Sequence, residues 1–127
     1  MKLLIDTHTF LWFIHDDPKL SDHAVSLLES DADLLLSTAS LWEIAIKVNL
    51  QKLTLPAPYE FFIPRQIQVN RIEILPIQIS HLAVAVKLPL HHRDPFDRLL
   101  ISQAIAEQMS IISIDQTFDR YAVDRLW

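Results

Sequence analysis

Residues 94–115 read DPFDRLLISQAIAEQMSIISID, and this stretch contains a complete helix-to-strand unit. Asp94 can cap the helix and Pro95 can take its first position, where a missing backbone N–H carries no cost. Leucine, isoleucine and alanine side chains then recur at helical spacing. The apolar run over residues 110–114 is typical of a buried strand, and it ends at Asp115. The stretch therefore predicts a helix that packs against a central strand.

The same alternation of strand and helix patterns runs through the rest of the chain. Further strands are expected over residues 2–5, 34–36 and 71–77, and the tail through Trp127 can add an edge strand. Further helices are expected over residues 7–14, after a Ser21-Asp22 cap, from a Thr38 or Ser40 cap to Leu53, over about 59–70, and over 81–88 after a Ser80 cap. The fourth helix contains Pro64, so its form is left open. Strands that alternate with helices predict an α/β fold around a mostly parallel sheet.

Composition excludes several classes of site. The chain has 127 residues, of which 50% are hydrophobic, so it suits one domain with a core of its own. It has no cysteine, which excludes disulfides, zinc sites with thiolate ligands and cysteine nucleophiles. It has no glycine either. A Walker loop and a dinucleotide-binding fingerprint both need glycine, because the backbone must approach phosphate closely, so both are excluded.

The charge of the chain limits how it can bind nucleic acid. A formal net charge of −5 argues against binding through bulk positive charge. A polyanionic substrate would need bound cations or a local patch of Lys and Arg. The acid at Asp6 comes too early for the apolar region of a signal peptide, and no apolar run approaches the roughly 18–20 residues that span a bilayer. We therefore expect a soluble cytoplasmic protein without a membrane segment.

Four acidic residues lie where the expected elements would bring them to one edge of the sheet. Asp6 and Asp115 each follow a strand candidate. Glu43 lies near the start of the third helix, and Asp97 lies in the first turn of the sixth. The carboxyl ends of parallel strands border the crevice where ligands bind. Converging carboxylates repel one another, and a hard divalent cation such as Mg²⁺ or Mn²⁺ relieves this repulsion. Two such ions about 3.5–4 Å apart can activate a water and stabilise the leaving oxygen of a phosphodiester.

Each of these acids also has a purely structural interpretation. Asp6 can cap the next helix, and Asp115 can begin a turn. Glu43 can pair with Lys47 four residues later, which is worth about 0.2–0.5 kcal/mol on a helix surface. Asp97 can favour the helix dipole by roughly 0.3–1 kcal/mol. Their shared placement, rather than any single residue, favours a metal site.

Neighbouring polar residues leave alternatives open. His91 and His92 can orient a substrate or simply form a polar loop, and His8 can line the cleft. No histidine pair has the spacing typical of a zinc site. Hydroxyl groups can hold a water bound to the metal, although they more often cap helices; the candidates are Ser37, Thr38 and Ser40.

Four segments together resemble a known family. They are LIDTH at 4–8, SLWEIAIK at 40–47, RDPFDRLLI at 93–101 and IDQTFD at 114–119. In this order they closely resemble the PIN-domain toxins of bacterial type II toxin–antitoxin pairs, the VapC group. The resemblance covers essentially the whole chain, and the second and third segments are long enough to be specific.

The resemblance implies one PIN-like nuclease domain over residues 1–127, folded as a three-layer α/β/α sandwich. It implies an endoribonuclease that depends on Mg²⁺ or Mn²⁺, forms a homodimer and is held silent by a small VapB-like antitoxin. The family's catalytic and metal-binding acids fall on Asp6, Glu43, Asp97 and Asp115, so the quartet is complete. Asp119 lies close enough to Asp115 to be an alternative fourth acid. Four large apolar residues also favour a dimer unless core packing explains them: Trp12, Trp42, Phe61 and Phe62.

Other functions fit the pattern less well. A non-catalytic module that holds RNA or a protein in the same groove would be favoured by the loss of one acid, and none is lost. A structure-specific DNA nuclease related to the five-prime nucleases has similar acids, but the short chain lacks the added helices expected to grip duplex DNA. A phosphatase of the haloacid dehalogenase type would need an Asp two residues after Asp6, where this chain has His8.

Overall fold

All five strands of the computed structural model, which describes residues 1–127, run parallel in one sheet of order β3-β2-β1-β4-β5. The strands are β1 (Lys2–Ile5), β2 (Asp33–Ser37), β3 (Glu73–Leu75), β4 (Ser110–Ile112) and β5 (Arg125–Leu126). The central β1 pairs with both neighbours through Leu4, which lies opposite Leu35 on β2 and Ile111 on β4. The predicted α/β class is confirmed, and the sheet is parallel throughout. The predicted edge strand in the tail is confirmed as β5.

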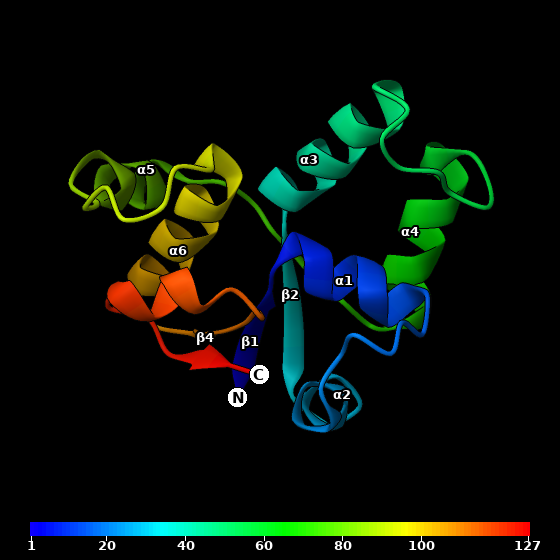
Figure 1. Ribbon diagram of the computed structural model, residues 1–127, viewed down its shortest axis with the longest axis horizontal. Helices are drawn as coiled ribbons and strands as arrows, with labels where there is room; N and C mark the ends of the chain where they lie inside the picture. Colours follow the sequence, from blue (N-terminus) through cyan, green and yellow to red (C-terminus); the bar gives the residue numbers. More distant parts are fainter.

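Helices cover both faces of this sheet. The helices are α1 (Thr7–Ile14), α2 (Asp22–Leu28), α3 (Thr38–Asn49), α4 (Tyr59–Val69), α5 (Ile79–Val86) and α6 (Pro95–Glu107), with a 3-10 helix η1 (Gln116–Arg120). Successive strand side chains point to opposite faces. Leu3 and Ile5 therefore join the core under α1 to α4, while Leu4 joins the core under α6. Figure 1 shows α5 and α6 on one side of the sheet and α1, α2 and α4 on the other. The two helical layers and the sheet between them form the three-layer α/β/α sandwich that the resemblance implied.

The strand order reverses beside β1. The chain passes from β1 outward to β2 and β3, and then returns to place β4 on the other side of β1. In open α/β sheets the crevice for ligands lies at such a switch point, outside the carboxyl ends of the strands. Asp6 follows β1 directly, and Asp115 lies three residues beyond the end of β4. The topology therefore places both acids beside this crevice.

Helix caps confirm some predicted starts and correct others. Asp94 accepts hydrogen bonds from the N–H groups of Phe96 at 2.8 Å and Asp97 at 3.0 Å, so α6 starts as predicted. The third helix is capped by Ser37, not by Thr38 or Ser40, because Ser37 Oγ accepts from the N–H of Ala39. It ends at Asn49 instead of Leu53, since Gln51 has a positive φ of 59° that the helix cannot contain.

Three other predicted boundaries were too wide or displaced. The helix predicted after Ser80 is α5, which is capped by Gln78 and ends at Val86. The strand predicted over 71–77 is only Glu73–Leu75, because Pro76 has no N–H to continue the ladder. The strand predicted over 110–114 ends at Ile112, where Ser113 Oγ accepts the N–H of Asp115 at 3.0 Å and turns the chain.

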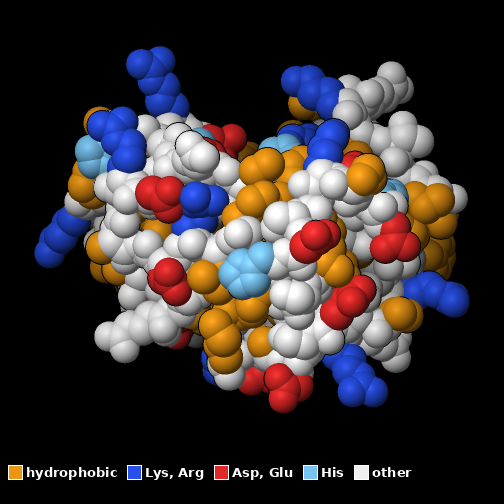
Figure 2. All heavy atoms as spheres, turned by 60° about the horizontal axis from the view of Figure 1, so that its bottom comes forward, with side chains coloured by type: hydrophobic (Ala, Val, Ile, Leu, Met, Phe, Trp, Pro, Cys, Tyr) orange, Lys and Arg blue, Asp and Glu red, His pale blue; other side chains and the backbone are white.

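The fourth helix is continuous despite its proline. Pro64 lies inside α4 with an exposed side chain, so water can satisfy the carbonyl that its ring leaves unpaired. None of the helices combines the length and the apolar character needed to cross a bilayer. On the face shown in Figure 2, Lys and Arg side chains are interspersed with acidic and apolar ones instead of forming one basic surface.

Candidate active site

Asp6 lies at the carboxyl end of the central strand. Its Oδ1 accepts a hydrogen bond from the N–H of Thr9 at 2.9 Å, so the residue does cap α1. Only 4% of Asp6 is exposed. Burial raises the pKa of its carboxyl group, although hydrogen bonds from Ser113 and Thr9 lower it. The capping role therefore coexists with a buried carboxylate that is costly to ionise.

Glu43 has one satisfied oxygen and one that is not. Its Oε2 lies 3.0 Å from Lys47 Nζ, so the helix pair expected from the spacing is present. Its Oε1 is buried and accepts no hydrogen bond. A buried carboxylate oxygen without a partner costs free energy, because the water it loses is not replaced. Glu43 thus has an oxygen available for a further cation.

Asp97 lies in the first turn of α6, close to the other acids. The pKa of Asp97 is raised to about 7, chiefly by burial and then by the negative charges of Asp94, Asp6 and Glu43, while His92 lowers it. Burial by itself disfavours the charged form of a carboxyl group, and nearby carboxylates add to this effect. The structure therefore brings together Asp97 on α6, Glu43 on α3 and Asp6 just after β1, which are far apart in sequence.

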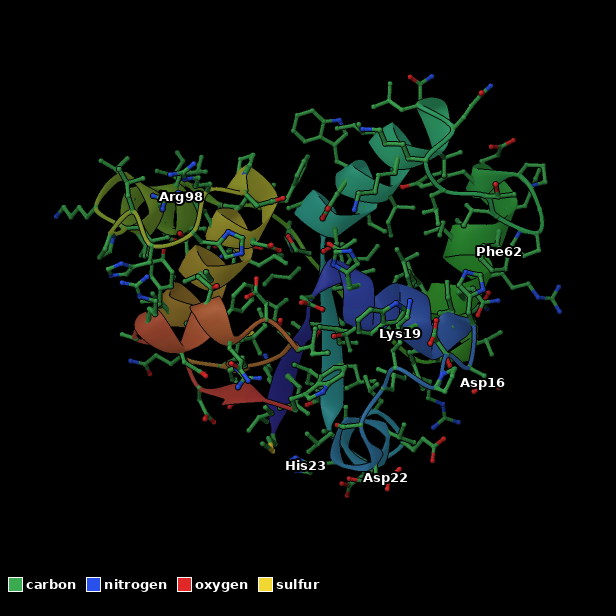
Figure 3. The ribbon with its side chains drawn as sticks, in the orientation of Figure 1. Asp16, Lys19, Asp22, His23, Phe62 and Arg98 are labelled. Atoms are coloured by element: carbon green, nitrogen blue, oxygen red, sulfur yellow. The ribbon has the colours of Figure 1, made fainter.

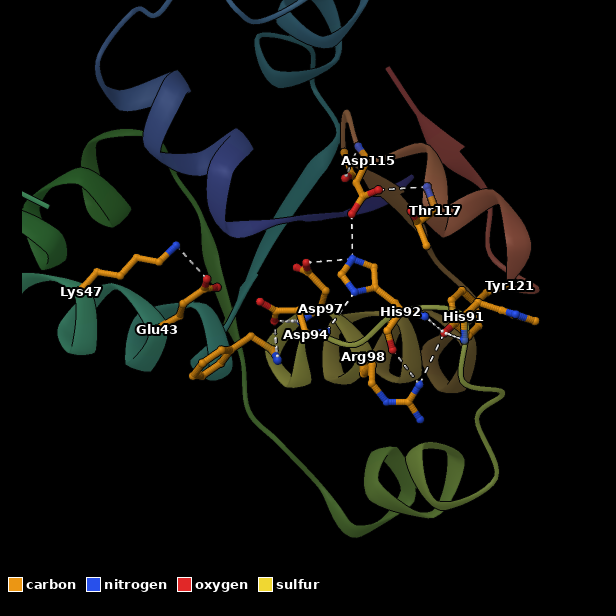
Figure 4. Close-up of polar contacts among 12 residues, drawn as sticks. Glu43, Lys47, His91, His92, Asp94, Asp97, Arg98, Asp115, Thr117 and Tyr121 are labelled. Carbon is orange, nitrogen blue, oxygen red and sulfur yellow. Dashed lines mark hydrogen bonds and ion pairs between the residues drawn. The ribbon is translucent and has the colours of Figure 1, made fainter. Parts of the chain in front are cut away.

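Asp115 joins the group through His92, which is shown between Asp97 and Asp115 in Figure 4. His92 Nε2 lies 2.7 Å from Asp115 Oδ2 and 3.2 Å from Asp97 Oδ2. Burial raises the pKa of Asp115, but hydrogen bonds from Thr117 and His92 outweigh it, and the net pKa is lowered. His92, Asp97 and Asp115 each place one possible ligand atom within 4.8 Å of the others.

The alternative fourth acid, Asp119, has a different environment. Arg125 donates from Nε to Asp119 Oδ1 at 2.8 Å and from its terminal nitrogen to Oδ2 at 3.0 Å. This hydrogen bonding lowers the pKa of Asp119. Both oxygens of Asp119 are therefore hydrogen-bonded to the guanidinium group of Arg125. Asp115, in contrast, contacts the same His92 nitrogen as Asp97. The geometry favours Asp115 over Asp119 as the fourth acid.

The other polar residues considered from the sequence have different surroundings in the structure. His92 enters the acidic group, while the ring of His91 packs on Tyr121, with the ring centroids 5.1 Å apart. His8 is exposed on α1 beside Trp12. Ser40 is buried and its Oγ accepts from the hydroxyl of Thr7 at 2.9 Å, so it links α3 to α1 instead of capping a helix. Sequence alone did not distinguish His92 from His91, because both lie in one short polar segment and no spacing rule separates them.

The acids fit a hard divalent cation. The group offers carboxylate oxygens, which are the ligands that Mg²⁺ and Mn²⁺ prefer. The Oε1 of Glu43 has no partner in the protein, burial raises the pKa of Asp6, and nearby carboxylates add to the effect of burial on Asp97, so ionising all of these acids together is unfavourable without added positive charge. A cation among these groups would supply the missing charge. This arrangement can therefore bind metal and, through it, the phosphate of a polyanion.

Comparisons with known proteins agree with this architecture. The sequence model of the PIN-domain family matches residues 3–124 of this chain. No match is found among curated protein sequences. VapBC2 from Rickettsia felis, solved with a DNA fragment from its promoter, is similar at a TM-score of 0.75 and 18% identity, over 99% of this chain and 98% of that chain. DNA-bound VapBC from Salmonella typhimurium gives 0.73 and 15%, over 99% and 97%.

A toxin–antitoxin complex from Klebsiella pneumoniae is also similar, with a TM-score of 0.66 and 14% identity over 98% of this chain and 96% of that chain. At such low identity these three structures support the fold alone. The family assignment comes from the sequence model, which spans nearly all of the chain. The chain belongs to the PIN-domain family.

Proposed function

We propose that this protein is a single-domain endoribonuclease that requires Mg²⁺ or Mn²⁺, hydrolyses RNA phosphodiester bonds and acts as the cytoplasmic toxin of a toxin–antitoxin pair. The buried Oε1 of Glu43 carries the proposal, since it has no partner in the protein and lies on the helix that faces Asp97. The four carboxylates of Asp6, Glu43, Asp97 and Asp115 would hold the metal.

The protein's own residues prepare the acids for this task. Thr9 and Ser113 hold the carboxylate of Asp6 by hydrogen bonds. Lys47 engages one oxygen of Glu43 and leaves the other free. When bound, a divalent cation supplies positive charge for the phosphodiester and lowers the pKa of water. Held side chains of this kind reduce the reorganisation that a bound substrate would otherwise require.

The proposed partner is a small VapB-like antitoxin, and the proposed assembly is a homodimer. Support comes from the structural neighbours, which include VapBC proteins and a structure described as a toxin–antitoxin complex. It also comes from the four motif segments, which resemble the VapC group in sequence order.

The test is metal-dependent cleavage of single-stranded RNA by purified protein. We expect no cleavage in EDTA and recovery when Mn²⁺ or Mg²⁺ is added in excess. Asp6→Asn keeps the shape of the side chain but removes its charge, so we expect at least about a hundredfold lower rate with the fold retained. Asp33→Asn is the matched control, because Asp33 is an exposed acid at the opposite end of the neighbouring strand.

Other results of this assay would contradict the proposal or favour one of the rival functions. Full turnover by folded Asp6→Asn in metal-stripped buffer would refute the metal mechanism. RNA binding without cleavage at saturating Mn²⁺ would instead indicate a binding module. Cleavage of DNA but not RNA would indicate a DNA nuclease.

A further inference from the structure

The ring of His92 touches two of the acids assigned to the metal site, and its other nitrogen has a partner of its own. Nε2 lies 2.7 Å from Asp115 Oδ2 and 3.2 Å from Asp97 Oδ2. On the opposite side, Nδ1 accepts a hydrogen bond from the backbone N–H of Asp94 at 3.1 Å. Three acidic residues from two segments of the chain are therefore connected through one imidazole.

The contact with Asp94 determines which nitrogen carries the proton. An imidazole nitrogen that accepts a hydrogen bond has a free lone pair and no hydrogen. Nδ1 accepts from a backbone N–H, so the proton of the ring is on Nε2. A protonated Nε2 has no lone pair for a metal, but it can donate to a carboxylate oxygen. Histidines that bind a metal show the reverse arrangement, with the second ring nitrogen donating to a protein group.

The ring has little freedom to leave this position. Its edge packs on Phe118, with the ring centroids 5.7 Å apart. The backbone N–H of His92 donates to Tyr121 Oη at 2.6 Å, and its carbonyl accepts from Arg98 at 3.2 Å. Side chain and backbone are therefore both held, and Nε2 is aimed at the two carboxylates.

We propose that His92 is a positioning residue, whose Nε2–H fixes the carboxylates of Asp97 and Asp115 for a divalent cation without binding the cation itself. This role rests on the proposed metal-dependent function. Asp115 Oδ2 is the hydrogen-bond acceptor and keeps a second lone pair for the metal, while Asp97 Oδ2 lies 3.2 Å from the same nitrogen as an ion-pair contact. His92 thus sets where two ligands point, although it contributes none.

The first test is the protonation of the ring in the wild-type protein. Long-range ¹H–¹⁵N NMR distinguishes the two nitrogens, and the spectrum of His92→Gln identifies the signal among the six histidines. We expect the proton on Nε2 without metal and again with saturating Mg²⁺. A proton that moves to Nδ1 when Mg²⁺ is added would overturn the proposal, because Nε2 would then be a ligand.

The second test compares two substitutions, each of which retains a polar group at the position of only one of the two ring nitrogens. His92→Gln can place an amide N–H near the position of Nε2, whereas His92→Asn can reach only the position of Nδ1. Calorimetric titration with Mn²⁺ needs no RNA. We expect His92→Gln to bind Mn²⁺ within about threefold of wild type, and His92→Asn to bind about 10–100-fold more weakly.

Both variants lose the aromatic contact with Phe118, so a purely structural role would affect them alike. Equal Mn²⁺ affinity in the two variants, with wild type binding normally, would overturn the role of His92 and leave the proposed function intact. A wild-type protein that binds no Mn²⁺ would overturn both. If one of the two variants fails to fold in a thermal melt, the spectrum of the other still identifies the His92 signal, so the NMR result on wild type decides the proposal.

Discussion

Asp94 and Asp97 are three residues apart in sequence, yet their carboxylates have different roles. Asp94 Oδ1 accepts two backbone N–H groups at the start of α6. Asp97 lies near Asp6 and Glu43, and its pKa is raised to about 7 by burial first and then by the charges of Asp94, Asp6 and Glu43. A motif search treats the two residues alike, whereas the structure assigns a cap to the first and a shared electrostatic environment to the second.

Substitution should separate these two roles. Asp94→Ala should lower the free energy of unfolding by about 1 kcal/mol, the usual cost of a lost cap, while the folded enzyme keeps much of its rate. Asp97→Asn should remove most cleavage. In EDTA, the raised pKa of Asp97 means that the folded state holds a proton that the unfolded state releases between about pH 4 and 7. Wild-type stability should therefore fall as pH rises through this range.

The Asn variant lacks that titration, so its melting temperature relative to wild type should be higher at pH 8 than at pH 5. The measurements are melting temperatures in EDTA at both pH values and initial rates with Mn²⁺. An inactive Asp94→Ala together with an active Asp97→Asn would show that the third acid of the site has been misplaced.

At the scale of elements, the segment between α5 and α6 is held by two side chains from elsewhere. Tyr121 Oη accepts from the N–H groups of His91 at 2.8 Å and His92 at 2.6 Å, and it donates to the carbonyl of Pro89 at 2.8 Å. Arg98, labelled in Figure 3, extends from α6 and donates to the carbonyls of Leu88 and Pro89. The segment that carries His92 is thus fixed by hydrogen bonds to its backbone.

Tyr121→Phe should therefore destabilise the protein by about 1–3 kcal/mol, because two backbone donors and one acceptor lose their partner. Tyr59→Phe is the matched control, since its hydroxyl makes one hydrogen bond, to the carbonyl of Leu41 at 2.7 Å. That loss should cost less, about 0.5–1.5 kcal/mol. Urea unfolding of both variants measures the difference. A loss in Tyr121→Phe no larger than in Tyr59→Phe would mean that the hydroxyl does not hold this segment.

At the scale of the whole molecule, the large apolar residues divide into two groups. Trp12 and Phe62 pack against the core, and Phe62 lies on α4, where it stacks with His15 at the end of α1 (Figure 3). Core packing therefore accounts for both of them. Trp42 and Phe61 are 65% and 70% exposed, and no such account applies to them. Exposed apolar side chains of this size favour burial against another chain.

We accordingly expect the protein to form a dimer, alone or with its antitoxin. Light scattering after size exclusion, over a range from low to high micromolar protein, should give twice the chain mass of 14.7 kDa, or that dimer plus antitoxin. A monomer at every concentration, both alone and when produced with its genetic neighbour, would contradict the dimer. The same experiment shows whether a partner binds at all.

Local chemistry determined much of this fold from sequence. Asp94 and Pro95 define the start of α6 through a side-chain cap and a fixed φ, and neither depends on distant residues. The apolar runs before Asp6 and Asp115 likewise predicted central strands, because only buried strands accommodate such runs here. The convergence of acids followed from strand direction alone, since parallel strands end at the same edge of a sheet.

Tertiary contacts decided the rest. Ser37 rather than Ser40 caps α3 because Ser40 hydrogen-bonds to Thr7, which is 33 positions away. The unpaired oxygen of Glu43 arises only when neighbouring elements bury it. His92 differs from His91 because the folded chain brings Asp115, which is 23 positions away, to its Nε2. Local patterns predict backbone conformation, but the protonation and pairing of a side chain depend on neighbours that the fold alone supplies.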